Sequence, residues 1–171
     1  EMEDFASRYA EELQAKGIGF GKTRIGIHSG DVIVGNFGGS AIFDYRALGD
    51  AVNTAARLES VNKHLGTTFC ISETTLAGCP EKVAVRPIGR LVLQGKRQAL
   101  KVYEPGSSRR ARGYAPEKEY RLAYDLMAQD APENGRDGTA PALGAFRDLA
   151  ERYPDDPLVA LHLKRLSSGM H

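Results

Sequence analysis

This sequence of 171 residues lacks the features of nucleic-acid-binding, membrane-spanning and secreted proteins. Its 23 lysines and arginines nearly balance its 22 aspartates and glutamates, and a net charge of +1 provides no global field that would attract nucleic acid or an anionic membrane. No apolar run approaches the length of a transmembrane helix, and no signal peptide is recognisable. We therefore expect this segment to contact neither nucleic acid nor membrane and to be cytoplasmic, while a membrane anchor elsewhere in a longer parent stays open.

Residues that usually bind metals or form disulfides are also few. The two cysteines, Cys70 and Cys79, do not have a zinc-site spacing, and we expect them to be free thiols. The four histidines are scattered, and we interpret His28, within a predicted strand, as a core or interface residue. The glycine-rich segment 35–39 lacks the Lys-Ser/Thr pair of a phosphate-binding loop. It predicts a tight turn, with Phe37 at its tip as a dimer contact.

Periodicity and turn residues predict a mixture of helices and strands. Amphipathic spacing favours helices over 3–15 and 51–65, and Asp50 and Gly66 are suited to cap the two ends of the second helix. A turn at 29–31 would join the first two strands. Strands are expected over 24–28, 32–35, 42–47, 67–71, 82–86, 89–93 and 99–104. This pattern predicts an α+β fold.

The C-terminal third of the chain changes character. We divide the sequence into residues 1–106, a polar and basic linker over 107–115, and a helical appendage over 116–171. Apolar stripes in the appendage, and a last helix over 157–167, indicate a helix pair that resembles a single tetratricopeptide-like unit. Because one such unit cannot bury its own apolar face, we expect it to pack on the first part of the chain or on another chain.

Asn53 and Arg57 are the most informative pair in the sequence. Four residues apart in the predicted helix 51–65, they share one face, opposite an apolar stripe. An amide both donates and accepts hydrogen bonds, and a guanidinium matches the geometry of phosphate oxygens. The pair suits the orientation of a nucleotide sugar and the stabilisation of a phosphoryl transition state. Taken singly, each residue is better explained as an ordinary polar surface residue, and only the surrounding motif favours a function.

The sequence around this pair is similar to a known family. Residues 43–59 read Phe-Asp-Tyr-Arg-Ala-Leu-Gly-Asp-Ala-Val-Asn-Thr-Ala-Ala-Arg-Leu-Glu, and residues 24–36 read Arg-Ile-Gly-Ile-His-Ser-Gly-Asp-Val-Ile-Val-Gly-Asn. Together they resemble the C-terminal half of a class III adenylate/guanylate cyclase catalytic domain, over residues 22–105. The resemblance implies half of a ferredoxin-like α+β domain, truncated at its N-terminal side, and a homodimer with active sites at the interface.

The same resemblance implies roles for individual residues. Asn53 would orient the ribose, and Arg57 would stabilise charge on the phosphates while the 3′-hydroxyl attacks the α-phosphate. In the family, two aspartates of the other protomer hold two divalent cations. Those aspartates belong to earlier segments that have no match here, and Asp31, Asp44 and Asp50 are not their equivalents. The implied Mg²⁺ or Mn²⁺ would take its ligands from the missing half, and no residue of this chain is assigned to metal.

Lys96 is the residue that the resemblance associates with the terminal phosphate. The family often has a lysine after a glycine at this place, and Lys96 follows Gly95. An apparent insertion of one residue in this turn leaves Arg97 as a competing candidate. A solvated hairpin turn without a ligand is an equally good interpretation of the segment.

Arg46 and its neighbour Ala47 stand where the family reads the purine of the substrate. Adenylate cyclases often carry Asp or Thr at the first position and guanylate cyclases often carry Cys, so arginine matches neither. A guanidinium only donates hydrogen bonds. Arg46 could therefore face an acceptor atom of either purine, or form a salt bridge with Asp44 or Asp50.

Together, these implications favour a fragment of a bacterial adenylate cyclase. The parent would convert ATP to 3′,5′-cyclic AMP and pyrophosphate, and this chain alone would be inactive because its metal ligands are missing. Two alternatives stay open. One is a guanylate cyclase acting on GTP, and the other is a non-catalytic half-cyclase that binds a partner or a nucleotide without turning it over.

Overall fold

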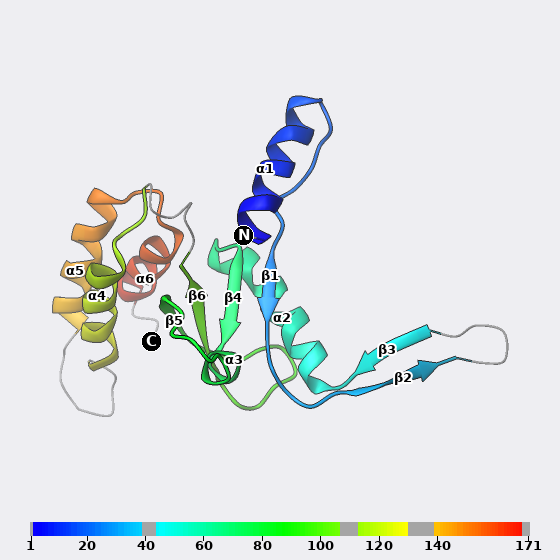
Figure 1. The fold of residues 1–171 in the computed structure, drawn as a ribbon. Coiled ribbons are helices and arrows are strands. Elements are labelled where there is room, and N and C mark those ends of the chain that lie inside the picture. The colour runs from blue at the N-terminus through cyan, green and yellow to red at the C-terminus, as the bar shows by residue number, and fades with distance from the viewer. Residues whose placement is uncertain (1, 39–43, 107–112, 130–138, 169–171) are drawn as a thin grey trace.

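The computed structural model describes residues 2–38, 44–106, 113–129 and 139–168, and it has the expected α+β architecture (Figure 1). The helices are α1 (Met2–Ala15), α2 (Asp50–Leu65), α3 (Glu73–Ala77), α4 (Glu117–Gln129), α5 (Thr139–Arg152) and α6 (Pro157–Ser167). The strands are β1 (Ile25–Ile27), β2 (Ile33–Phe37), β3 (Asp44–Leu48), β4 (Phe69–Ser72), β5 (Val85–Leu91) and β6 (Leu100–Pro105). The last residue of the turn predicted over 35–39 and most of the predicted linker fall outside the described residues.

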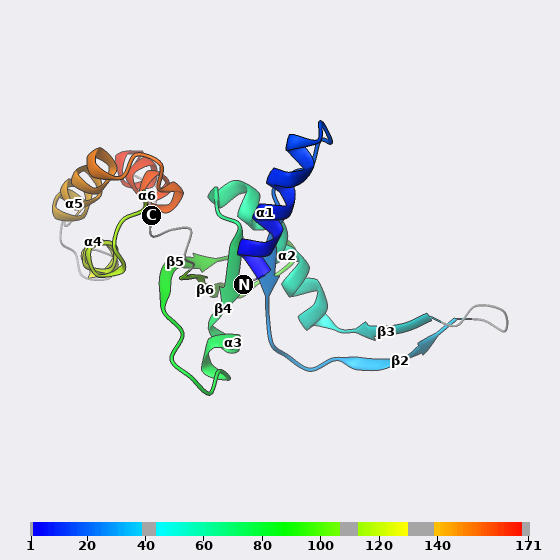
Figure 2. The same cartoon turned by 45° about the horizontal axis from the view of Figure 1, so that its top comes forward.

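A four-stranded sheet with the order β1-β4-β6-β5 lies at the centre of the molecule. Strand β1 is parallel to β4, and the other neighbours are antiparallel. Strands β2 and β3 form a separate antiparallel ribbon that projects away from this sheet (Figures 1 and 2). The predicted hairpin across residues 29–31 is therefore wrong, because β1 pairs with β4 and β2 with β3.

Other local predictions were also wrong. Gly49 is the N-cap of α2 and no side chain caps the helix, because Asp50 is already helical and its carboxylate contacts Lys96. The two strands expected over 82–86 and 89–93 form the single strand β5, with an irregular register between Pro87 and Gly89. Segment 35–37 lies inside β2, so the turn predicted there is absent and Phe37 ends a strand.

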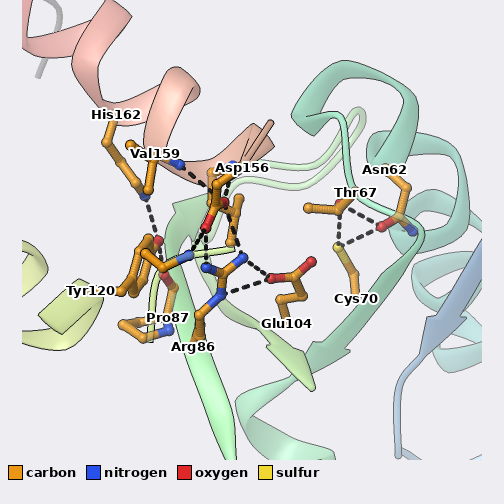
Figure 3. Close-up of polar contacts among 12 residues, drawn as sticks. Asn62, Thr67, Cys70, Arg86, Pro87, Glu104, Tyr120, Asp156, Val159 and His162 are labelled. Carbon is orange, nitrogen blue, oxygen red and sulfur yellow. Dashed lines mark hydrogen bonds and ion pairs between the residues drawn. The ribbon is translucent and has the colours of Figure 1, made fainter. Parts of the chain in front are cut away.

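The C-terminal end of α2 is fixed to the sheet by buried polar side chains. Gly66 caps the helix with φ +74°, as expected. The side-chain oxygen Oδ1 of Asn62 accepts hydrogen bonds from Thr67 Oγ1 at 2.7 Å and from Cys70 Sγ at 3.1 Å (Figure 3). Cys70 and Cys79 are free thiols, as expected, and burial raises the pKa of Cys70 to about 12.

Gly26 lets α2 lie directly on β1. A Cβ at this position would lie 2.2 Å from the backbone nitrogen of Glu59 and 2.4 Å from the carbonyl oxygen of Ala55, both in α2. Backbone atoms inside a helix cannot move aside without breaking its hydrogen bonds. Gly26 therefore sets the distance between the sheet and the helix that carries Asn53 and Arg57.

Gly26→Ala is expected to lower the free energy of unfolding by about 1–3 kcal/mol or more, because the added methyl group must push α2 away from β1. Urea denaturation followed by circular dichroism measures the change. Gly21→Ala is the matched control, since a Cβ at Gly21 would meet no atom within 4 Å. Equal denaturation midpoints for the two variants would contradict this view of the β1–α2 contact.

The three C-terminal helices share one hydrophobic core with the sheet. Tyr120 of α4 is fully buried, and its hydroxyl donates a 2.7 Å hydrogen bond to the carbonyl oxygen of Pro87 in β5. A Cβ on Gly66 would lie 2.9 Å from Cβ of Pro157 at the start of α6. The expected packing of the appendage on the first part of the chain is confirmed. Its likeness to a tetratricopeptide unit stays a prediction, as does our division of the sequence.

A buried ion network joins α6 to strands β5 and β6 (Figure 3). Arg86 of β5 donates to Asp156 at 2.5 Å and to Glu104 of β6 at 2.7 Å. All three residues are at most 4% exposed. Asp156 also caps α6 and accepts a hydrogen bond from the backbone of Ala115. One carboxylate therefore fixes the start of α6, the approach to α4 and the sheet.

His162 of α6 is buried against Tyr120. Its Nε2 lies 2.9 Å from the Tyr120 hydroxyl, which itself donates to Pro87, so Nε2–H is the donor in this contact. Within the described ranges, Nδ1 has no hydrogen-bond partner. Burial, with the positive charges of Arg165 and Arg86, lowers the pKa of His162 to about 3. The folded protein therefore holds this imidazole in its neutral form.

Stability should fall on acidification between the two pKa values of His162. The unfolded imidazole titrates near 6.5 and the folded one near 3, so the unfolded state binds the extra proton in this window. The contribution of His162 to the free energy of unfolding is complete above pH 6.5, and below it this contribution falls by about 1.4 kcal/mol per pH unit. Unfolding free energies from pH 4.5 to 7.5 should show a shallower slope for His162→Phe than for wild type. His64→Phe, at an exposed position of α2, should keep the wild-type slope, and equal slopes for all three would refute the assignment.

Candidate functional site

Helix α2 presents Asn53 and Arg57 on the face turned away from the sheet. Asn53 is exposed and Arg57 is half-buried, whereas Ala51, Leu58 and Leu65 on the other face are buried. The amphipathic pattern of the sequence therefore placed this pair correctly.

The loop between β5 and β6 returns to the start of α2. Lys96 Nζ forms an ion pair with the carboxylate of Asp50, the first residue of the helix. The turn before it has Gly95 at φ +74°, and a Cβ there would lie 3.3 Å from Nη2 of Arg57. The guanidinium of Arg57 thus lies against this turn. The structure brings Lys96 to the start of the helix that carries the pair, while Arg97 is exposed.

The charges of this cluster influence one another. The hydrogen bond from Lys96 lowers the pKa of Asp50, and the positive charges of Lys96 and Arg57 act in the same direction. Burial, and then the charge of Lys96, lower the pKa of half-buried His28. His28 Nδ1 lies 2.9 Å from Oγ of Ser72, so this imidazole connects the ends of β1 and β4 beside the cluster. Two cations and one carboxylate leave an excess of positive charge here, which suits an anionic ligand.

Arg46 and Ala47 lie on the projecting ribbon and are exposed. Arg46 Nε donates to Asp44 Oδ2 at 2.6 Å, so the salt bridge forms with this aspartate, whereas Asp50 is engaged by Lys96. Among the contacts of the described residues, none brings Arg46 or Ala47 into the cluster at the start of α2. Their role at the same nucleotide stays a prediction.

Sequence reasoning missed the contact between Asp50 and Lys96. The two residues are 46 positions apart, and no spacing rule connects a helix start with a distant hairpin turn. Asp50 looked like a helix cap, which its residue type and position favour. The available sequence signal was that two residues of opposite charge stand in segments that each carried a predicted role.

Possible ligands for Mg²⁺ or Mn²⁺ are scattered among the described residues. Among them, no group of three or more His, Cys, Asp or Glu side chains lies close enough together to hold a metal ion. The carboxylate within the cluster, Asp50, is paired with Lys96. None of the described helices has the length and apolarity needed to cross a bilayer.

Residues 5–104 match the family described as the adenylate and guanylate cyclase catalytic domain, and the chain belongs to this family. Adenylate cyclase 1 of Rhizobium meliloti (strain 1021) is 37% identical over 103 residues, which cover 60% of this chain and 16% of that protein. Adenylate cyclase of Anabaena cylindrica is 39% identical over 83 residues, or 47% of this chain and 16% of that protein. The chain thus spans a small part of these curated relatives.

A solved structure shows the same fold. The crystal structure of the adenylyl cyclase CyaB from P. aeruginosa superposes with a TM-score of 0.54 at 29% sequence identity. The match covers 64% of this chain and 55% of that chain. Class III cyclases of this kind are generally dependent on divalent metal ions, act on nucleotides and function as dimers.

Proposed function

We propose that this chain is part of an adenylate cyclase, to which it contributes the nucleotide-holding half of a composite active site. The parent would convert ATP to 3′,5′-cyclic AMP and pyrophosphate in the cytoplasm. The observation that carries the proposal is the return of Lys96 to the start of α2, beside Arg57, in a chain of the cyclase family. The names of the Rhizobium and Anabaena relatives support ATP as the substrate.

Each of three side chains would have its own task. The exposed amide of Asn53 would hydrogen-bond the ribose and hold the 3′-oxygen in line with the α-phosphate. The fork of Arg57 would bind phosphate oxygens most strongly as their charge grows in the transition state. The ammonium of Lys96, with three N–H donors, would bind the terminal phosphate. The divalent ions on which this class depends, Mg²⁺ or Mn²⁺, would be held by residues outside this chain.

The projecting ribbon supports a homodimer. Side chains with large apolar surfaces stand exposed on β2, β3 and their flanks, and Ile33 and Tyr45 are each 72% exposed. The group comprises Val32, Ile33, Val34, Tyr45 and Leu48. Ile33 and Leu48 share one face of the ribbon, and Val34 and Tyr45 lie on the other. Apolar side chains exposed on both faces of a projecting ribbon support its role as an interaction site. A second copy of the protein would cover it and bring the ribbon of one protomer to the active site of the other.

A chimera tests the proposed activity. Residues 5–104 of this chain replace the matching segment of the Rhizobium adenylate cyclase 1, which supplies the remaining half of the domain. The chimera is expected to form cyclic AMP and pyrophosphate from Mn²⁺-ATP, and this chain alone is expected to form none. A folded, dimeric chimera that makes no cyclic AMP would overturn the proposal, and turnover by the isolated chain would show that it is not a half-site.

Arg46 should influence the choice between ATP and GTP. Its ion pair with Asp44 uses Nε and Nη2, so Nη1 is left to donate to an acceptor on a purine. Arg46→Thr in the chimera is expected to change the ratio of kcat/KM values for ATP and GTP by about tenfold or more, because such a site discriminates by hydrogen bonding. Arg90→Thr, at an exposed position of β5, should leave the ratio unchanged. If Arg46→Thr behaves like this control, the purine is read elsewhere.

A further inference from the structure

The ion pair between Lys96 and Asp50 places Lys96 at the start of α2, but Asp50 itself has no chemical task in the function proposed above. The ammonium of Lys96 is already occupied, since it donates to the carboxylate of Asp50. The side chain of Lys96 is 25% exposed and that of Asp50 is 75% exposed. The pair therefore lies at the surface, where an incoming ligand can reach both groups.

The Asp50 carboxylate lies where a phosphate group would be favoured. It is on the first residue of α2, where free backbone N–H groups and the helix dipole favour negative charge. Lys96 donates to it, and the positive charges of Lys96 and Arg57 both act on it. Each of these groups would attract a phosphate oxygen for the same reasons. The Asp50 carboxylate therefore occupies a position, and makes a contact with Lys96, that would also favour a phosphate oxygen of a ligand.

We propose that Asp50 is an internal counter-ion that occupies Lys96 in the nucleotide-free protein and must yield it to a phosphate of the incoming nucleotide. This inference rests on the proposed function, because it refines the role given there to Lys96. Asp50 acts through Lys96 and is thus a positioning residue. It weakens the binding of every phosphate ligand, and ligands with the most phosphate charge displace it best.

The test uses inorganic tripolyphosphate as the probe and the whole chain of 171 residues. Amide chemical shifts of residues 93–97 and of α2 are followed by NMR during the titration. Asp50→Asn is expected to lower the dissociation constant about two- to fivefold, the range that an exposed ion pair is worth. Asp50→Glu should restore the wild-type value. Asp31→Asn removes an exposed carboxylate from the loop that touches Gly49 and should change nothing.

A double-mutant cycle separates competition for Lys96 from simple charge repulsion. In a Lys96→Met background, Asp50→Asn should no longer tighten binding. An equal gain in both backgrounds, equal dissociation constants for wild type and Asp50→Asn, or no binding of tripolyphosphate at all would each overturn the counter-ion role. The proposed function fails on a different result, the absence of cyclic AMP from the chimera, so the two failures are distinguishable.

Discussion

Arg57→Ala in the chimera is expected to lower kcat by about 10²–10³-fold and to raise KM far less. The guanidinium lies on α2 beside the turn at Gly95, where it could bind phosphate oxygens as charge develops on them. An interaction that strengthens in the transition state affects kcat more than substrate binding. Initial rates over a range of Mn²⁺-ATP concentrations give both constants.

Two controls make the result specific. Lys63→Ala removes an exposed cation from the last turn of the same helix and should leave kcat unchanged. Arg57→Lys keeps the charge but loses the fork, and it should recover only part of the lost rate. An unchanged kcat for Arg57→Ala would reduce this residue to an ordinary surface cation.

Asp156→Ala in the chain of 171 residues is expected to lower the free energy of unfolding by about 3–5 kcal/mol. The substitution leaves Arg86 buried with Glu104 as its remaining carboxylate, and it also removes the cap of α6 and the acceptor for the backbone of Ala115. A buried hydrogen-bonded charge that loses a partner is strongly destabilising even where the intact pair contributes little. Chemical denaturation followed by circular dichroism measures the change.

Asp155→Ala is the matched control, because the neighbouring aspartate is exposed. It should shift the unfolding free energy by about 0.5 kcal/mol or less. If both variants have the same free energy of unfolding as wild type, the C-terminal helices are not anchored through this network. If only Asp156→Ala is destabilised, α6 and the sheet belong to one cooperative unit.

Local features of the fold and site were predictable from the sequence. The face of α2 that carries Asn53 and Arg57 was predictable from helical periodicity. The end of α2 at Gly66 was predictable because glycine readily adopts the left-handed conformation that ends a helix. Both depend on residues within a few positions of one another. The family resemblance added the link to Lys96, which helical spacing alone does not provide.

Features that depend on distant pairing were not predictable. The parallel partner of β1 is β4, far along the chain, although a nearer strand and a turn favoured a hairpin. Arg86 and Asp156 are 70 positions apart, and charged residues are expected at the surface unless a partner is known. The contact between Asp50 and Lys96 was unpredictable for the same reason, because the two residues are distant in the sequence. Each of these pairings is decided by the assembled sheet.

The composite site is tested most directly by mixing two inactive chimeras. One carries Arg57→Ala, and the other has its metal-binding aspartates replaced in the part supplied by the Rhizobium enzyme. A mixed dimer then contains one site in which the aspartates of the first protomer face Arg57 of the second. Mixing is expected to restore about a quarter of the parental cyclic AMP formation, since half of the dimers are mixed and each has one intact site. An inactive mixture in which mixed dimers are shown to form would contradict the assignment of Arg57 to the partner's site.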